Sequence, residues 1–390
     1  MLAHRTNLFA SSGTAAARSA AKAAAANGNA IVDLTCGEII SDLAPTIRSG
    51  ALAAIQNGAN RYTDTVGMPE LREALARKVS LETGQIWQTE EIAVTTGAKQ
   101  ALFNATMVLL NPGDEVLIPA PYWTTFPAQV AIAGAKAVFV DTRRTGFVPT
   151  VANLERAMSA RTRAIVLNTP SNPTGAVYDH DTLVAIARLA ISHDLWVIFD
   201  ECYRAFTYDP FVHHPITAVV PEVRQRTVIV NAFSKELAIT GWRIGYLAAP
   251  RDVVSAVKAF QSHTTSNPNV VAQHAVLTHL RDGDSSFERS LRTRLAIART
   301  RGLRILSRIE RLPAPKAEGG FYFYLDLANI LGPGETADDV VSRLLAEVGV
   351  ASVSGTAFGD PTGLRLSYGV PIEQLEAGLE RLLPVLNGWH

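Results

Sequence analysis

The stretch from residue 228 to residue 246 reads Val-Ile-Val-Asn-Ala-Phe-Ser-Lys-Glu-Leu-Ala-Ile-Thr-Gly-Trp-Arg-Ile-Gly-Tyr. Its first three residues are β-branched, which is typical of a short buried parallel strand. Residues 231–234 interrupt this run, so we expect Lys235 at the carboxyl end of the strand. In open α/β sheets that edge is where ligands bind. The stretch therefore predicts a buried strand and a binding site at its end.

Lys235 and Arg243 have side chains that suit one particular kind of ligand. The amine of a lysine can form a Schiff base with an aldehyde, and the planar guanidinium of an arginine binds phosphate through two parallel hydrogen bonds. Pyridoxal phosphate carries both an aldehyde and a phosphate. A Ser-Lys dipeptide alone is far more often a solvated surface lysine, and Arg243 alone is more often a charge at a helix end. The longer pattern favours the ligand.

The pair Ser234-Lys235, followed by Gly-Trp-Arg-Ile-Gly at residues 241–245, resembles the signature of class I pyridoxal-phosphate aminotransferases. The resemblance covers about residues 12–386, and its motifs come in the order found in that family. It implies an enzyme of fold type I, similar to aspartate aminotransferases, with pyridoxal 5'-phosphate as cofactor. It also implies a homodimer whose sites are shared across the interface.

Bulk properties limit the classes of function. The chain has 390 residues, 47% of them hydrophobic, which is enough for one large domain and a smaller one. Its 36 basic and 36 acidic residues balance, so neither nucleic acid nor an anionic membrane is an expected partner. No apolar run approaches the roughly 20 residues of a membrane span.

Two features of the sequence indicate the cellular compartment of the protein. The two cysteines, Cys36 and Cys202, cannot form a disulfide framework and favour a reducing compartment, so we expect a cytoplasmic protein. Residues 1–32 contain no acidic residue and are rich in alanine. This composition leaves a targeting segment open, although an N-terminal arm followed by an amphipathic helix is the preferred interpretation.

The regular part of the pattern predicts an α/β fold. Seven apolar or β-branched runs alternate with helical patterns, which predicts a mostly parallel seven-stranded sheet covered on both faces. We place this sheet in a large domain that binds the cofactor, residues 45–290. A smaller α+β domain is expected to be built from both chain ends, residues 1–44 and 291–390, with residues 281–311 mostly helical. The runs are 92–96, 116–118, 137–140, 164–167, 196–199, 227–230 and 245–248.

The phosphate is expected where the first of these strands runs into a helix, at Gly97, Ala98 and Lys99. Free N–H groups and the positive end of a helix form a natural cradle for an anion. The junction is not specific by itself, but the chain lacks the glycine fingerprints of dinucleotide and nucleoside-triphosphate sites. Many relatives carry a serine where this chain has Ala232. The phosphate is therefore expected to depend on Ala98, Arg243, Thr96, Tyr62 and Ser234.

The resemblance assigns further residues to the cofactor ring. Asp200 follows four apolar residues, and a carboxylate there would pair with the protonated pyridine nitrogen. Tyr203 and Asn172 would donate hydrogen bonds to the phenolic oxygen, and Trp123 would stack on the ring. Tyr62 would reach the phosphate of the neighbouring subunit. Taken singly, Trp123 and Tyr62 are more often packed aromatic residues.

The resemblance also assigns the substrate site. Arg365 lies between two leucines of a strand, and a buried arginine requires an anion, which here would be the α-carboxylate of the substrate. A structural ion pair is the alternative for this residue. The backbone of Gly37 would approach the same carboxylate, and Trp123 and Asn172 would line the site. Residues Ser12, Thr14 and Lys99 resemble those around the distal carboxylate in bacterial aspartate aminotransferases, whereas His263 has no clear match.

The function predicted from these residues is transfer of an α-amino group between an L-amino acid, with aspartate or glutamate as the leading guess, and a 2-oxo acid such as 2-oxoglutarate. Lys235 is the expected catalytic residue, and no metal is expected. The same scaffold can run other pyridoxal-phosphate reactions, such as those of a lyase, a decarboxylase or a cyclase. A regulator on this fold would need an added DNA-binding domain, and a nicotinamide oxidoreductase would need the missing glycine fingerprint.

Overall fold

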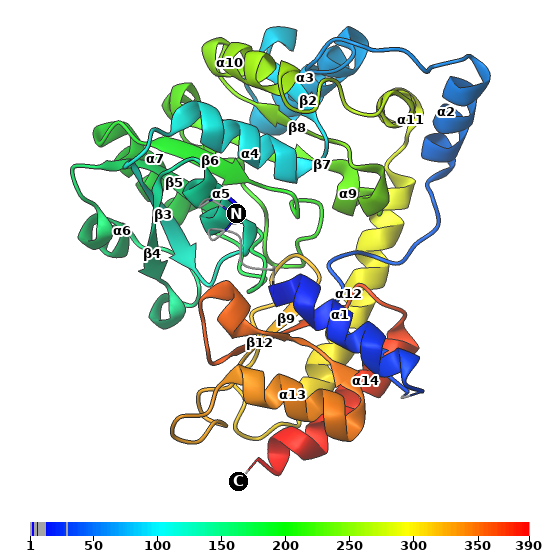
Figure 1. The fold of residues 1–390 in the computed structure, drawn as a ribbon, viewed down its shortest axis with the longest axis vertical. Coiled ribbons are helices and arrows are strands. Elements are labelled where there is room, and N and C mark those ends of the chain that lie inside the picture. Colours follow the sequence, from blue (N-terminus) through cyan, green and yellow to red (C-terminus); the bar gives the residue numbers. More distant parts are fainter. Residues whose placement is uncertain (1, 4–5, 7–12, 29, 390) are drawn as a thin grey trace.

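The structure is a computed structural model that describes residues 2–3, 6, 13–28 and 30–389. A seven-stranded sheet with helices on both faces forms one part, and smaller sheets with four long helices form the other (Figure 1). The strands of the large sheet are β2 (Ile92–Thr95), β3 (Glu115–Ala120), β4 (Lys136–Asp141), β5 (Thr162–Asn168), β6 (Trp196–Asp200), β7 (Thr227–Ala232) and β8 (Gly245–Ala248).

The strand order is β2-β8-β7-β6-β5-β3-β4, and β8 runs in the direction opposite to the other six strands of this sheet. Each of the seven runs in the sequence corresponds to one of these strands. The prediction of a mostly parallel seven-stranded sheet is therefore confirmed. The sequence pattern did not reveal the reversed direction of β8.

The two faces of the sheet are covered because side chains alternate along each strand. Ile198 of β6 packs with α4 (Ala98–Leu109), α5 (Thr125–Ile132) and α10 (Arg251–Ser262) on one face. Its neighbours Val197 and Phe199 pack with α6 (Val151–Ala157), α7 (His180–Ser192) and α8 (Ile216–Val219) on the other. Around β2, β7 and β8, this second face is continued by α2 (Pro45–Gln56), α3 (Pro69–Thr83) and α11 (Val270–Asp282).

Helix ends follow local sequence signals. Pro69 occupies the first turn of α3, and Gly84 ends that helix in the left-handed conformation at φ +67°. Asp179 caps α7 by accepting a hydrogen bond from the backbone N–H of Thr182 at 2.8 Å. Short 3₁₀ helices complete this part: η2 (Thr89–Glu91), η3 (Arg143–Thr145), η4 (Pro221–Arg226) and η5 (Thr240–Trp242).

The smaller part combines the two ends of the described chain. Strands β11 (Val353–Ser354), β12 (Gly363–Ser367) and β9 (Tyr322–Asp326) form an antiparallel sheet, and β1 (Val32–Asp33) pairs in parallel with β10 (Val350–Ala351). The surrounding helices are α1 (Gly13–Ala26), α12 (Ser286–Leu306), α13 (Ala337–Val348) and α14 (Ile372–Asn387), with the 3₁₀ helix η6 (Gly355–Phe358) beside β12. The long helix α12 joins the two parts, and the domain limits at residues 44 and 290 stay a prediction (Figure 1).

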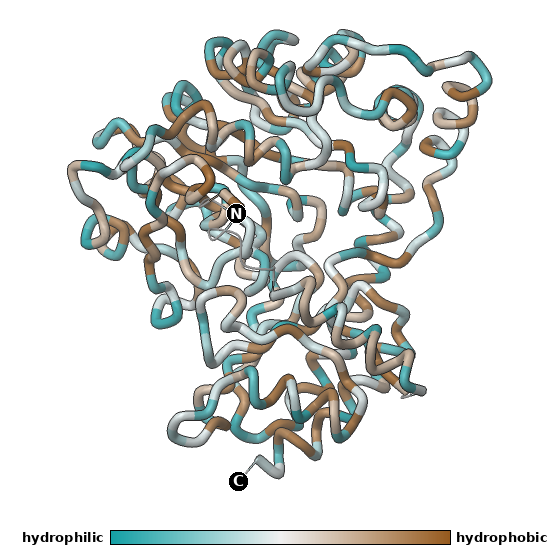
Figure 2. The backbone as a smooth tube through the Cα atoms, in the orientation of Figure 1, coloured by the Kyte–Doolittle hydropathy of each residue, from teal (hydrophilic) through white to brown (hydrophobic). Residues whose placement is uncertain are grey.

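Hydrophobic and hydrophilic residues are interspersed along most helices (Figure 2). Among the described residues, no helix is both long enough and apolar enough to cross a membrane.

Candidate active site

A cavity of about 450 Å³ opens where the strands of the large sheet meet the smaller part of the molecule. The last residues of three adjacent strands line it: Asn168 of β5, Asp200 of β6 and Ala232 of β7. Because parallel strands deliver their carboxyl ends to one edge, residues far apart in the sequence meet there. The other lining residues are Thr14, Ala15, Arg18, Thr35, Gly37, Glu38, Ala98, Lys99, Trp123, Asn172, Cys202, Tyr203, Ser234, Lys235, Thr240, Arg243, Tyr322 and Arg365.

Lys235 lies in the short helix α9 (Phe233–Glu236), directly after β7. Its Nζ donates a hydrogen bond to the carbonyl oxygen of Gly37 and forms no ion pair with any described residue. Burial lowers the pKa of Lys235 to about 8, and the positive charges of Arg243 and Arg365 act in the same direction. A larger fraction of this amine than of an exposed lysine is therefore neutral near physiological pH and available as a nucleophile.

Asp200 is buried at the end of β6 and lacks a cationic partner among the described residues. Its Oδ1 accepts a hydrogen bond from the backbone N–H of Cys202 at 3.1 Å. Burial raises the pKa of Asp200 to about 6, and that backbone hydrogen bond only partly offsets the effect. A buried carboxylate without an ion pair, facing a cavity, suits a ligand that carries a protonated ring nitrogen.

Donors for an anion gather where β2 leads into α4. Gly97 precedes α4 at φ +74°, and the backbone N–H groups of Ala98 and Lys99 have no acceptor among the described residues. A Cβ at position 97 would lie 2.6 Å from Nη2 of Arg243, so a larger residue there would displace this guanidinium from the helix end. Arg243 is itself in the left-handed region at φ +53°, and its Nη1 donates to the carbonyl of Thr240 at 2.8 Å. Two free N–H groups, a helix N-terminus and an arginine together fit a phosphate.

Arg365 is 2% exposed and makes no ion pair with any described residue. Its Nη1 donates to Oδ1 of Asn172 and its Nη2 to the carbonyl of Thr35, both at 3.0 Å, while its Nε is buried without a partner. The guanidinium carbon lies 4.4 Å from the ring centroid of Tyr322. A buried guanidinium held only by neutral acceptors still requires an anion, as the sequence pattern suggested.

Aromatic and hydroxyl groups form the remaining walls. Trp123 lines the cavity, packs edge-on against Phe126 at 5.5 Å between ring centroids, and has the Nζ of Lys99 5.1 Å from its own ring centroid. The hydroxyls of Tyr203 and Tyr322 lie 3.2 Å apart, and burial raises the pKa of Tyr203 well above its usual value. Tyr203 therefore stays protonated and able to donate a hydrogen bond.

Most residues predicted for the site do meet in this cavity, but among the described residues Thr96, Gly97, Tyr62 and His263 do not line it. Gly97 lies behind Arg243, and Ser12 falls outside the described residues. Tyr62 is 90% exposed and lines a separate surface hollow together with residues 265–270. His263 is exposed at the end of α10.

Sequence reasoning gave no role to several residues that line the cavity. Arg18 and Glu38 form an ion pair there, and the hydroxyl of Thr240 donates to Glu38. One signal was present: Thr14 and Arg18 are four residues apart on an expected helix and so share a face. Glu38 also directly follows Gly37, a residue that the sequence did assign to the site.

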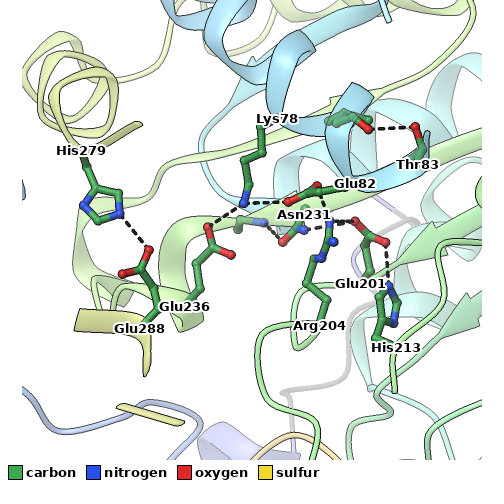
Figure 3. A network of polar contacts seen from close by, with 12 residues as sticks. Lys78, Glu82, Thr83, Glu201, Arg204, His213, Asn231, Glu236, His279 and Glu288 are labelled. Atoms are coloured by element: carbon green, nitrogen blue, oxygen red, sulfur yellow. Dashed lines mark hydrogen bonds and ion pairs between the residues drawn. The ribbon is translucent and has the colours of Figure 1, made fainter. Parts of the chain in front are cut away.

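A network of paired charges lies beside the site (Figure 3). It includes Glu201 and Glu236, which directly follow Asp200 and Lys235 in the sequence. Lys78 contacts Glu82 at 2.9 Å and Glu236 at 3.7 Å, and Arg204 pairs with Glu82 and with Glu201. Glu82, Glu201 and Glu236 thus each have a cationic partner from the same protein.

The fold and the cavity together define the class of protein. A buried lysine, a carboxylate without an ion pair and a phosphate cradle meet at the carboxyl ends of a mostly parallel sheet. These groups fit pyridoxal phosphate, and the molecule is a pyridoxal-phosphate-dependent enzyme of fold type I.

Comparison with known proteins gives the family. Residues 29–382 match the family described as aminotransferase class I and II. Aspartate aminotransferase of Geobacillus stearothermophilus is 35% identical over 98% of each chain, and aspartate/prephenate aminotransferase of Thermus thermophilus is 39% identical over 99% of each. A solved structure of the Thermus thermophilus aspartate aminotransferase with maleate superposes with a TM-score of 0.94 at 38% identity, covering 99% of this chain and 100% of that one. The chain belongs to the class I and II aminotransferase family and is a pyridoxal-phosphate-dependent aminotransferase acting on amino acids and 2-oxo acids.

Proposed function

We propose that this aminotransferase moves the α-amino group of L-aspartate or L-glutamate to a 2-oxo acid such as 2-oxoglutarate. The single observation that carries this proposal is the presence of two cations without a carboxylate partner among the described residues. Arg365 is buried, and Lys99 is exposed with its Nζ 5.1 Å from the ring centroid of Trp123, and both line the cavity. Two such cations suit a substrate with two carboxylates. The names of the relatives, aspartate and aspartate/prephenate aminotransferase, support the same substrate class.

The cofactor would be held by the groups that suit each of its parts. The N–H groups of Ala98 and Lys99 would bind the phosphate together with Arg243 and the hydroxyl of Ser234, and Gly97 would leave space for Arg243. Asp200 would keep the ring nitrogen protonated, and Trp123 would cover one face of the ring. Tyr203 and the amide nitrogen of Asn172 would donate hydrogen bonds to the phenolic oxygen. When bound, pyridoxal phosphate supplies an aldehyde that attaches amines covalently and a ring that delocalises the electron pair left after loss of the α-proton.

The protein's own groups would then bind the substrate and move one proton. Arg365 would bind the α-carboxylate near the backbone of Gly37, while Lys99 and Thr14 would face the side-chain carboxylate. The Nζ of Lys235, whose pKa is lowered to about 8 by burial, would accept the α-proton as general base and return it as general acid. The low pKa suits both roles near neutral pH.

A homodimer in the cytoplasm belongs to the same proposal. The large exposure of Tyr62 and its position beside residues 265–270 suit a surface that a second subunit covers, with Tyr62 reaching the partner's phosphate site. Sedimentation of the purified protein tests this part: a species of twice the chain mass supports it, and a monomer at working concentration contradicts it.

Two measurements test the reaction. A panel of amino donors with 2-oxoglutarate should give the highest kcat/KM with aspartate or glutamate, and prephenate is included as an acceptor because of the names of the relatives. Formation of both an oxo acid and the pyridoxamine form of the cofactor separates transamination from elimination or decarboxylation.

Replacement of the lysine tests the catalytic group. Lys235→Ala should lower turnover by at least about 10⁴-fold and abolish the cofactor mass that borohydride fixes to the parent protein. Lys136→Ala, at an exposed lysine paired with Glu115, is the matched control and should retain both properties. Normal turnover by the Lys235→Ala protein would refute the assignment.

A further inference from the structure

An ion pair lies on one wall of the cavity, and none of the functions proposed above uses it. Nη2 of Arg18 donates to Oε1 of Glu38 at 2.6 Å. Arg18 comes from α1, and Glu38 comes from the segment after β1. Their side chains are 48% and 32% exposed, so the pair is open to the cavity and to solvent.

Glu38 is fixed from more than one side. The hydroxyl of Thr240 donates to Oε2 at 2.7 Å, and Sγ of Cys36 lies 3.5 Å from Oε1. The hydrogen bond from Thr240 lowers the pKa of Glu38, and Arg18 lowers it further, so the carboxylate is charged at neutral pH. Glu38 would therefore remain in the cavity as an anion if Arg18 were absent.

The charges that line the cavity show what this pair contributes. Five cationic side chains line it: Arg18, Lys99, Lys235, Arg243 and Arg365. In the proposed function the last three serve the cofactor and the α-carboxylate. The side-chain end of the substrate is then left with two cations and Glu38. Without Arg18, Glu38 would cancel the charge of Lys99 and leave no net attraction for a second carboxylate.

The position of Arg18 agrees with this role. Thr14 and Arg18 are four residues apart on α1, so they lie on the same face of that helix, and both line the cavity. Thr14 is one of the residues proposed for the side-chain end of the substrate. Arg18 therefore lies next to that end.

We propose that Arg18 is a specificity-determining residue that neutralises Glu38 and so keeps the side-chain end of the pocket selective for dicarboxylic substrates. This inference rests on the proposed function. Its role is electrostatic: Arg18 sets the local charge, whereas the chemical step remains with Lys235. Amino acids with neutral side chains should be nearly indifferent to Arg18.

The test uses the holoenzyme and two probes that differ by one carboxylate, succinate and butyrate, with binding followed by the change in cofactor absorbance. Arg18→Met should weaken succinate binding by roughly threefold to fivefold and change butyrate binding less than about 1.5-fold, as expected for loss of one partly exposed charge interaction. Glu38→Gln should leave succinate binding equal or tighter. The double variant should recover most of the affinity that Arg18→Met loses, because the uncompensated carboxylate is gone.

Controls distinguish this role from a structural one. Arg18→Lys keeps the charge and should keep the preference for succinate, while Arg77→Met removes an exposed ion pair with Glu73 on α3 and should change neither probe. The inference is overturned if Arg18→Met weakens both probes equally, if it weakens neither, or if the double variant fails to recover. A parent enzyme that binds succinate no better than butyrate and prefers a neutral donor would instead refute the proposed function.

Discussion

Two regions of this molecule bury charged side chains: in one the charges form ion pairs, and in the other they do not. In the network of Figure 3, Lys78 and Arg204 contact the carboxylates of Glu82, Glu201 and Glu236. In the adjoining cavity, Lys235, Asp200 and Arg365 make no ion pair with any described residue. The two regions touch in sequence, since each of Glu201 and Glu236 directly follows a cavity residue.

The pKa shifts reflect the same difference. Burial alone would lower the pKa of Lys78, but Glu236 and Glu82 raise it above its usual value. Burial lowers the pKa of Lys235 to about 8, because nearby anions do not compensate. Charges that satisfy one another stabilise the fold, whereas charges left without partners are held ready for a ligand. The opposite charges that pair with the buried cavity residues must therefore come from a bound ligand.

The largest expected effect comes from removing the charge of an unpaired cavity residue. Asp200→Asn keeps the size of the side chain but removes the anion that would hold the proton of the ring nitrogen. We expect kcat to fall by roughly 10³–10⁴-fold, because this anion acts on the step in which charge develops on the ring. Steady-state kinetics measures this fall in kcat, and the urea concentration at the midpoint of unfolding should change little. A variant with more than a tenth of parental kcat would contradict the role.

A change in the network should act on stability instead. Arg204→Met leaves Glu82 and Glu201 without their shared arginine and should lower the free energy of unfolding by about 4 kcal/mol. Arg365→Met is the matched change in the cavity: it removes a buried charge that has no carboxylate partner. Arg365→Met should lower the free energy of unfolding much less than Arg204→Met does, and it should impair substrate binding. Urea unfolding of the two cofactor-free proteins compares them, and equal losses would remove the distinction between the regions.

The pH dependence of stability gives a third test, with the sign set by Lys235. In the cofactor-free protein its pKa is lowered from 10.5 to about 8, so the unfolded chain binds more protons between these values and stability rises with pH across this window. Below pH 8 the fold therefore carries the full cost of a buried ammonium group. Lys235→Met should be more stable than the parent by up to about 3 kcal/mol at pH 7. The difference in free energy of unfolding between the variant and the parent should vanish by pH 10.5. A difference that stays constant with pH would show that stability is not coupled to protonation of Lys235.

The smallest effect is expected at Lys99, which is exposed at the edge of the cavity. Lys99→Met should raise KM for aspartate by about tenfold or less, because solvent screens a partly exposed charge. Its effect on kcat should be small, since Lys99 serves the far end of the substrate. Comparison of aspartate with alanine as donor isolates this effect, and an equal loss with alanine would assign Lys99 to the cofactor alone.

Sequence reasoning predicted the parts of the fold that depend on local pattern. Apolar or β-branched runs marked each strand of the large sheet, although the run at residues 116–118 proved to be part of the longer β3. The alternation around Arg365 correctly indicated burial. The stretch 281–311 is mostly helical as expected, since α12 spans Ser286–Leu306, although Gly283 and Asp284 separate α12 from the end of α11 at Asp282.

Other features had no local signal. The antiparallel direction of β8 depends on how the chain returns to the sheet, which a single strand pattern does not encode. The pairing of Arg18 with Glu38 joins an alanine-rich helix to a loop, and only the fold brings them together. The network around Arg204 was missed for the same reason, since its members come from α3, α9 and the loop after β6.

One contact described above has a mechanical consequence. Arg365 belongs to β12, near the end of the chain, yet it hydrogen-bonds to Asn172 in the loop after β5. A substrate whose α-carboxylate is bound by that arginine, and whose α-carbon lies beside the Nζ of Lys235, would connect strand β12 to the middle of the chain. Bound substrate would thereby hold β12 and the middle of the chain in a fixed position relative to each other.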